Sequence, residues 1–511
     1  MSFSSADQLL RRRAIFALLA AARLLRRALT TSERTYRLLF LPGLEGVRWR
    51  FGKWRAWRAH EDARRSVPAY RDFVAAHGTP KVRARGFDPD LTTIPVTDKD
   101  NYVRRYSVEE RCVGGAIPPR GVVVDESSGT SGAPNNWVRG PEERTDVKQA
   151  MQLALHHQLG REPIFLINAF ALGPWATGMN VSMSVVDIAV LKSTGPDIAK
   201  IEATLELFGP SYRYVIAGYP PFLKALVDAA DVEWERYDLT AIYGGEGITE
   251  TMRDYLGRFF RRIYGSYGAS DLEINVAAEN DFTIALRRLL VERPDLLELV
   301  GRPEHGVLPL VLQYNPIDYY VESAETGELV VTVCRRENAS PKVRYNIRDL
   351  GHVVRLPELR RALASFGLSI DDLPPRADLP LLFLYGRADD AVAYYGCKVT
   401  PANVEEAVYS VPELAGVVQA FALVLTEDEN AEKRLAIALE LNEGAWPPAD
   451  VERLRDQVVE RLAEVNQDFR EAARFMPAAA RPALELHAAG TGPFAGHDVR
   501  LKRRYVIGPL V

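Results

Sequence analysis

Short apolar segments rich in β-branched residues alternate along this chain with longer segments of helical spacing, and this alternation constrains the fold more than any other feature. The strand-like segments cover residues 121–124, 164–168, 214–217 and 328–333. The segments with helical spacing cover residues 147–159, 199–208 and 250–262. Because strands that alternate with helices build a parallel or mixed sheet with helices on both faces, the sequence predicts an α/β fold.

The length of 511 residues is too great for a single hydrophobic core, and the pattern changes after Leu350. Three prolines, Pro374, Pro375 and Pro380, interrupt the alternation before one more apolar strand. The elements that follow are that strand, two further strands, a helix and a short strand, at residues 381–385, 416–425, 434–441, 450–465 and 483–486. We therefore expect a large N-terminal domain over residues 1–385 and a small α+β domain over residues 386–511.

The composition favours an ordinary globular protein and argues against a nucleic-acid ligand. Lys and Arg number 64 against 68 Asp and Glu, so the formal net charge of -4 gives no global attraction to nucleic acid. The cysteines Cys112, Cys334 and Cys397 are widely separated and show neither a disulfide framework nor a metal-ligand spacing. This cysteine usage fits a reducing environment, and we expect a cytoplasmic protein.

The first 30 residues are apolar but rich in arginine. The stretch from Leu9 to Leu29 contains Arg11, Arg12, Arg13, Arg23, Arg26 and Arg27. Its uncharged part, residues 14–22, is far shorter than the roughly 20 residues that span a bilayer, and no small-residue cleavage pattern marks a signal peptide. We expect an amphipathic surface helix over residues 1–30 and no transmembrane segment. Peripheral contact with an anionic membrane is the alternative to packing on the protein or on a partner.

A loop rich in glycine and hydroxyl side chains follows the predicted strand at residues 122–124. Glycine lets the main chain turn so that several N–H groups point at one anion, and Ser and Thr add short donors. The loop lacks the Gly-Lys-Ser/Thr ending of a Walker P-loop, and a flexible turn would also explain its composition. We interpret it as an oxyanion-binding loop formed by Ser127, Ser128, Gly129, Thr130, Ser131 and Gly132.

The segment from Glu126 to Pro134 resembles the phosphate-binding signature of the adenylate-forming superfamily of acyl-CoA synthetases, adenylation domains and luciferases. Segments similar to further motifs of that superfamily follow in the same order, at residues 243–246, 264–271, 344–351, 386–390 and 396–405. Residues 67–70 and 94–102 resemble the phenylacetate–CoA ligase branch, and the matches together span about residues 67 to 505. The resemblance implies a large multi-sheet N-terminal domain, a small mobile C-terminal lid, ATP held by the oxyanion-binding loop, and Mg²⁺ and coenzyme A.

The resemblance also assigns nucleotide contacts. The adenine and ribose contacts that it implies are Gly244, Gly245, Glu246, Tyr267, Gly268, Asp349 and Arg387. The ring of Tyr267 would stack on adenine, although a buried tyrosine is as often a packing residue with a bonded hydroxyl group. Asp349 would accept ribose hydroxyls, or else pair with Arg344 or Arg348. Arg387 would contact phosphate or ribose, or else form a surface ion pair with Asp389.

The acid pocket and the hinge follow from the same resemblance. The acid pocket would be lined by Phe170, Gly173, Trp175 and Gly178, although an aromatic stripe is more often plain core. The small domain would swing about Asp389 or Asp390, which protects a hydrolysable intermediate from water.

Two positions depart from the pattern of the superfamily. Asp271 stands where members usually carry a glutamate that helps to bind Mg²⁺, and the shorter aspartate is still a hard oxygen ligand, with Glu273 as a second candidate. His497 stands where members carry a lysine that stabilises charge as the acyl adenylate forms, and such a donor contributes about 10²–10³ in rate. The candidate replacements are His497 itself and Lys502.

The function that these features predict is ATP-dependent adenylation of a carboxylic acid, aromatic or arylacetic by resemblance, followed by transfer to the thiol of coenzyme A. The alternatives are another acceptor, namely an amine, a carrier-protein thiol or nitrite; a nucleotide-binding protein that has lost turnover; and a protein that docks on a membrane or a partner. The sequence leaves the oligomeric state open, a homodimer included.

Overall fold

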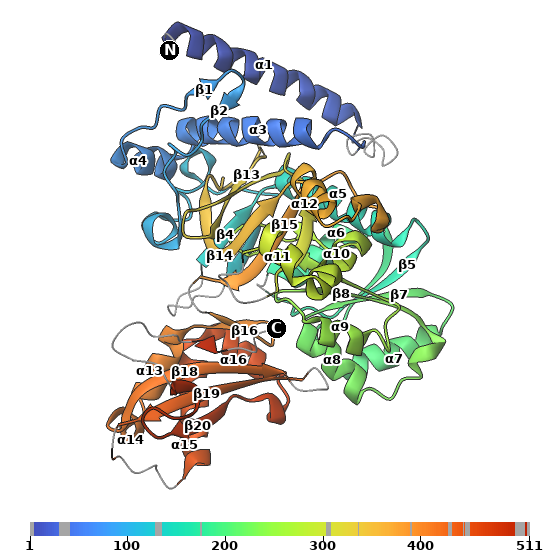
Figure 1. The fold of residues 1–511 in the computed structure, drawn as a ribbon, viewed down its shortest axis with the longest axis vertical. Helices are drawn as coiled ribbons and strands as arrows, with labels where there is room; N and C mark the ends of the chain where they lie inside the picture. Colours follow the sequence, from blue (N-terminus) through green and yellow to red (C-terminus); the bar gives the residue numbers. More distant parts are fainter. Residues whose placement is uncertain are drawn as a thin grey trace.

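The structure, a computed structural model, describes residues 5–29, 41–127, 135–173, 176–302, 308–335, 337–388, 391–427, 432–442, 444, 450–495 and 506–507. Figure 1 shows two bodies along the long axis, with the N-terminal helices at one end and a small domain at the other. The large body holds a mixed sheet with helices packed on it, so the predicted α/β fold is confirmed.

One sheet of 11 strands forms the large domain, with the order β12-β13-β14-β15-β11-β10-β9-β8-β7-β5-β6. The strands from β9 to β6 pair in parallel. They are β5 (Ile164–Asn168), β6 (Ala189–Ser193), β7 (Arg213–Gly218), β8 (Asp238–Gly244) and β9 (Arg262–Tyr267). The other strands pair antiparallel. They are β10 (Ala277–Ala278), β11 (Leu310–Tyr314), β12 (Tyr319–Ser323), β13 (Glu328–Val333), β14 (Tyr345–Val354) and β15 (Leu381–Arg387).

Helices cover both faces of the parallel half because alternate residues of a strand point to opposite sides. In β5, Phe165 and Ile167 join a core with helices α7, α8 and α9, whereas Ile164 and Leu166 join a core with α5 and α6. Three more helices, α10 to α12, pack on the antiparallel half. The helices are α5 (Pro141–Leu159), α6 (Ala176–Val185), α7 (Ile198–Phe208), α8 (Pro220–Ala229), α9 (Glu250–Leu256), α10 (Asp281–Glu292), α11 (Pro294–Val300) and α12 (Leu356–Ser365).

The N-terminal elements lie against the antiparallel half of the large sheet, and α1 runs along the outside of α3 (Figure 1). These elements are α1 (Ser5–Leu29), α3 (Glu45–Ser66), α4 (Pro68–Ala76), β1 (Ala84–Arg85) and β2 (Asp88–Pro89). No helix among the described residues is long and apolar enough to cross a membrane.

The small domain has its own core beneath a sheet of order β20-β19-β18-β21. Its strands are β16 (Val392–Tyr394), β17 (Cys397–Val399), β18 (Val418–Glu427), β19 (Lys433–Leu441), β20 (Ala483–His487) and β21 (Val506–Ile507). Its helices are α13 (Pro401–Tyr409), α14 (Pro412–Ala415), α15 (Val451–Val465) and α16 (Gln467–Ala473). The last strand of the large sheet, β15, ends at Arg387, two residues beyond the boundary that the sequence suggests.

Two local predictions differ from the structure. The helix expected over residues 250–262 ends at Leu256, where Gly257 caps it, because Arg262 already begins strand β9. The strand expected at residues 121–124 runs instead from Val123 to Ser127 and pairs with β4 (Asn135–Arg139) in a separate hairpin.

Candidate active site

A cavity of about 360 Å³ lies between the two domains, at the carboxyl ends of the parallel strands. Strand β8 ends at Gly244 and β9 ends at Tyr267, and the residues just beyond these ends line the cavity. Residues of the β16–β17 hairpin and of α16 line its other side. Ligands of open α/β sheets bind at the carboxyl ends of the strands, so this cavity is the candidate active site.

One wall of the cavity carries a carboxylate next to two lysines. Asp271 accepts a hydrogen bond from the Tyr345 hydroxyl group at 3.0 Å, and its Oδ2 lies 3.2 Å from Lys99 Nζ. Burial on its own would raise the pKa of Asp271, but the ammonium groups of Lys99 and Lys398 hold that pKa below its ordinary value. Asp271 is therefore ionised at neutral pH, and Lys99 is its direct counter-charge.

Lys99 is positioned by the large domain. It is the first residue of a short helix, η2 (Lys99–Val103), whose N-cap Asp98 accepts a hydrogen bond from the Asn101 main-chain N–H. Just before this helix, the main chain of Thr97 forms hydrogen bonds with Arg344 and Asn346 at the start of β14. The capped turn and the strand contact together fix the direction from which Lys99 enters the cavity.

Lys398 reaches the same cavity from the small domain, where it lies in β17. Burial, followed by the cations Arg387 and Lys99, lowers the pKa of Lys398, whereas Asp349 and Asp271 oppose that change. Asp271 is thus the point at which one lysine from each domain comes close.

Asp349 and Arg387 stand directly opposite each other in the pairing of β14 with β15. Arg387 donates to Asp349 Oδ1 at 2.9 Å, and the Tyr267 hydroxyl group donates to Oδ2 at 2.6 Å. Arg344 pairs instead with Glu322, and Arg348 with Asp100. Arg387 lines the cavity, whereas Tyr267 is buried in the core beside β14. The stacking of Tyr267 on adenine stays a prediction.

Two residues just after β8 have distinct structural roles: Gly245 occupies a position that only glycine fits, and the Glu246 carboxylate contacts the small domain. Gly245 has a φ of +87°, and a Cβ atom there would lie 2.6 Å from the ring of Tyr219. Glu246 Oε1 accepts the main-chain N–H of Gly396 at 3.4 Å, and its Oε2 lies 3.3 Å from Lys433 Nζ. Burial raises the pKa of Glu246, and Lys433 counteracts this. A contact between Glu246 and adenine stays a prediction.

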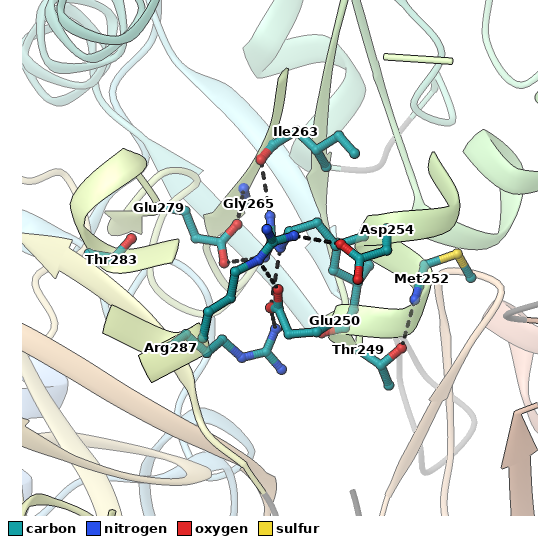
Figure 2. Close-up of polar contacts among 12 residues, drawn as sticks. Thr249, Glu250, Met252, Asp254, Ile263, Gly265, Glu279, Thr283 and Arg287 are labelled. Carbon is teal, nitrogen blue, oxygen red and sulfur yellow. Dashed lines mark hydrogen bonds and ion pairs between the residues drawn. The ribbon is translucent and has the colours of Figure 1, made fainter. Parts of the chain in front are cut away.

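A buried ion-pair network holds the ends of β8 and β9 in place. Glu279 is fully buried and accepts hydrogen bonds from Arg253 at 2.6 Å, from the Tyr243 hydroxyl group at 2.9 Å and from the Gly265 N–H at 2.7 Å. Figure 2 shows the bond between Glu279 and Gly265, with Glu250 in the neighbouring ion pairs. Tyr243 is the first residue of the motif segment 243–246, and Gly265 lies in the motif segment 264–271. The network therefore fixes both segments beneath the cavity.

Part of the cavity wall is an apolar chamber, which we define by six side chains of one core cluster: Met151, Leu155, Leu166, Phe170, Val181 and Tyr264. Phe170, a predicted acid-pocket residue, meets Tyr219 edge to face with a centroid distance of 5.1 Å. Gly178 lies in α6, where a Cβ atom would come 2.2 Å from the Ala171 carbonyl oxygen, and Gly173 is exposed. A role for these two glycines in the acid pocket stays a prediction.

Glu273 lies on a second cavity of about 300 Å³ and not with Asp271. Its carboxylate pairs with Arg335 and accepts the Tyr319 hydroxyl group, and burial raises its pKa. Among the described residues, no three His, Cys, Asp or Glu side chains form a group that could hold a metal ion. The role of Glu273 as a metal ligand stays a prediction.

Several of the predicted site residues fall outside the described part of the chain. They are Ser128, Gly129, Thr130, Ser131, Gly132, Trp175, Asp389, Asp390, His497 and Lys502. Ser127 is the last residue of β3. The roles predicted for all of these residues stay predictions.

Sequence reasoning missed the two cavity lysines. Lys99 lies in the segment 94–102, and Lys398 lies between Gly396 and Pro401, so both fall within motif segments already noted. Each of these segments contains a lysine, and the C-terminal tail has His497 where the superfamily usually has a lysine. These two facts together were the available signal.

No protein-family model matches the chain, and no curated protein matches it in sequence. Solved structures do match its fold. A crystal structure of 2-hydroxyisobutyryl-CoA ligase with 2-HIB-AMP and CoA in the thioesterification state has a TM-score of 0.63 at 16% identity, with 92% of this chain and 91% of that chain covered. The chain has the fold of adenylate-forming enzymes.

Two further structures of that ligase give lower scores against the same adenylate-forming fold. The postadenylation state has a TM-score of 0.50 with 89% of this chain and 88% of that chain covered, and an open conformation has 0.50 with 90% of each, both at 16% identity. All three structures of that ligase therefore match this chain in fold.

Proposed function

We propose that this chain activates an apolar carboxylic acid with ATP, forming an acyl-AMP and pyrophosphate, and then transfers the acyl group to a thiol such as that of coenzyme A. The observation that carries the proposal is the cavity, in which a charged wall with Lys99, Asp271 and Arg387 adjoins the apolar chamber. A carboxylate requires cations close by, whereas the body of an apolar acid gains from a dry pocket. The adenylate-forming fold supports the same reaction.

In the first step, a carboxylate oxygen of the acid attacks the α-phosphorus of ATP, and pyrophosphate leaves with the electron pair of the broken P–O bond. Negative charge gathers on the carboxylate and the α-phosphate, so positioning and fixed cations provide most of the catalysis. Lys99 and Arg387 are cations that the large domain supplies at this wall. Arg387 and Asp349 are paired across two strands, where they would receive the ribose hydroxyls.

Mg²⁺ fits this site as an ion that enters with ATP. Magnesium ions in such sites use one or two protein carboxylates and take their other ligands from phosphates and water. Asp271 offers one ionised carboxylate on the cavity wall and would hold the ion. When bound, Mg²⁺ would neutralise phosphate charge. The Ser127 to Gly132 loop remains our proposal for the β- and γ-phosphate contacts.

The chamber supports an aromatic or arylacetic acid as the substrate class. Its six defining side chains are aliphatic or aromatic, and Phe170 and Tyr264 supply ring surfaces. A second carboxylate or an ammonium group placed among these side chains would be buried without a partner, which costs several kcal/mol. We therefore expect monocarboxylic acids with an apolar body to be favoured over dicarboxylic acids of the same length.

The second step depends on the small domain. Its hairpin brings Gly396 and Lys398 to the cavity. A thiolate that enters beside this hairpin would attack the acyl carbon, and AMP would leave with the electrons of the broken acyl–phosphate bond. The small domain thus serves acyl transfer, and the large domain serves adenylation.

ATP–pyrophosphate exchange with a panel of aromatic, arylacetic, aliphatic and dicarboxylic acids tests the first step. We expect exchange that depends on an added apolar monocarboxylic acid. Absence of exchange with every acid, in protein shown by calorimetry to bind ATP, would show instead a nucleotide-binding protein without turnover. Mass spectrometry of the products with and without coenzyme A then tests the second step. Exchange without any acyl-CoA would point to an amine, a carrier-protein thiol or nitrite as the acceptor.

A further inference from the structure

Helix α1 turns charged side chains toward the protein. Arg12 Nη1 lies 3.5 Å from Glu61 Oε1 on α3, and Arg23 pairs with Glu337. Gln8 forms two hydrogen bonds with the main chain of Ala84, one as donor and one as acceptor. Ile15 is fully buried and anchors the middle of the helix. The surface helix of an ordinary soluble domain has the opposite arrangement, with charges toward water.

The opposite side of α1 presents leucine and alanine to solvent. Leu10, Leu24 and Leu25 are 64%, 69% and 60% exposed. The exposed apolar residues of this side, which we call the outer face, are Leu9, Leu10, Ala14, Ala17, Leu18, Ala20, Ala21, Leu24 and Leu25. They cover about half of the helix circumference and run for about 24 Å along its axis. Among the residues of α1 whose exposure the structure describes, Arg13 is the exposed charged residue on this side.

Charge separates α1 from the rest of the chain. The helix contains six arginines and one aspartate, a net charge of +5, while the whole chain carries -4. The remaining residues therefore carry a net charge of -9. A helix with an apolar face and a net positive charge lies in the headgroup region of an anionic membrane, where the leucines of that face reach the acyl chains. Arg13, which is exposed beside those leucines, would meet lipid phosphates.

We propose that the outer face of α1 docks the protein on the surface of an anionic lipid bilayer. A second copy of the chain suits this face less well, because two helices of net charge +5 would repel each other across it. Figure 1 places α1 at the end of the large domain that is remote from the small domain. Docking through α1 therefore leaves the small domain and the cavity free of the membrane.

Flotation of the full chain with lipid vesicles tests the docking. The probes are vesicles of phosphatidylcholine alone and vesicles that also contain phosphatidylserine. We expect the protein to float with the phosphatidylserine vesicles and to be released by salt, which screens the net positive charge of α1. The combined variant Leu10→Gln, Leu18→Gln and Leu24→Gln should lower the bound fraction about tenfold or more, because each change removes apolar area from the face.

A matched control changes three exposed apolar residues far from α1: Leu207→Gln, Val291→Gln and Leu299→Gln. This control should float like the unchanged protein, and circular dichroism should show both variants folded. The proposal is overturned if the wild-type protein floats with neither kind of vesicle, or if the outer-face variant floats as well as the control. A second outcome would also overturn the proposal: no flotation of the wild type, together with a dimer in sedimentation that only the outer-face variant loses. That outcome would assign the outer face to a second copy of the chain.

Discussion

The two walls of the cavity are held in different ways. On the large-domain wall, Glu279 accepts three buried hydrogen bonds, and Asp349 is fixed by Arg387 and Tyr267. The small domain is held against the large domain by polar contacts of Gly396 and Lys433 with Glu246, and of Glu427 with Thr249. Buried and fully bonded charges make a rigid surface, whereas a few contacts between domains allow exchange of partners. The large-domain wall is therefore held more rigidly than the small-domain wall.

The largest effect should come from Lys99→Met. This change removes the cation that faces Asp271 without moving the small domain, and the loss of a fixed donor at a site of developing charge lowers the rate about 10²–10³-fold. ATP–pyrophosphate exchange measures it, with Lys200→Met on the exposed surface of α7 as the matched control. Equal exchange in the two variants would show that Lys99 only pairs with Asp271.

Glu279→Ala should weaken the large domain itself. The change leaves Arg253 buried with one fewer acidic partner, and breaking a buried pair costs about 3–5 kcal/mol. Thermal or urea unfolding measures the loss, and Glu298→Ala, at an exposed position of α11, is the control. If Glu279→Ala unfolds like the control, the buried bonds of Glu279 do not hold the large-domain wall in place.

Glu246→Gln should act mainly on the second step. The amide still accepts the Gly396 N–H but loses the charge opposite Lys433, so acyl transfer should fall about fivefold while exchange is retained. Single-turnover transfer from the enzyme-bound adenylate measures this effect against Glu405→Gln on the exposed side of α13. An equal fall in exchange would instead support the predicted adenine contact of Glu246.

The smallest effect is a dependence on pH. Burial raises the pKa of Glu246 in the folded protein, so its contribution to stability is fully present below the ordinary glutamate pKa. That contribution is lost as the pH rises through the raised value, because the buried carboxyl group must then ionise. As the pH rises, the unfolding temperature of the wild type should therefore fall relative to that of Glu246→Gln. A difference that grows in the other direction would mean that Lys433 outweighs burial.

Much of the fold could be read from the sequence because local patterns determine it. The strand segments 164–168 and 328–333 coincide with β5 and β13. The helix at 250–262 was too long, because its apolar spacing continues across Gly257 into residues that pair as β9. A strand partner that is distant in sequence overrides the local helical pattern there.

The site was only partly readable. The motif order pointed to Asp271, Arg387 and Phe170, which all lie on one cavity or beside it. Lys99 and Lys398 were missed because single lysines carry no spacing signal and come from elements that meet only in the folded chain. The contact of Glu246 with Lys433 depends on how one domain sits on another, and no local pattern encodes that arrangement.

The central claim is that the cavity joins a carboxylate to the α-phosphorus of ATP, and transfer of heavy oxygen tests it most directly. The acid that gives the fastest exchange is labelled in its carboxyl group with a heavy oxygen isotope, and the products of a complete turnover with acceptor are weighed by mass spectrometry. One labelled oxygen is expected in AMP and none in pyrophosphate, because the carboxylate oxygen that attacks the α-phosphorus stays with AMP when the acyl carbon–oxygen bond breaks. Label in pyrophosphate or phosphate, or unlabelled AMP formed together with acylated acceptor, would contradict it.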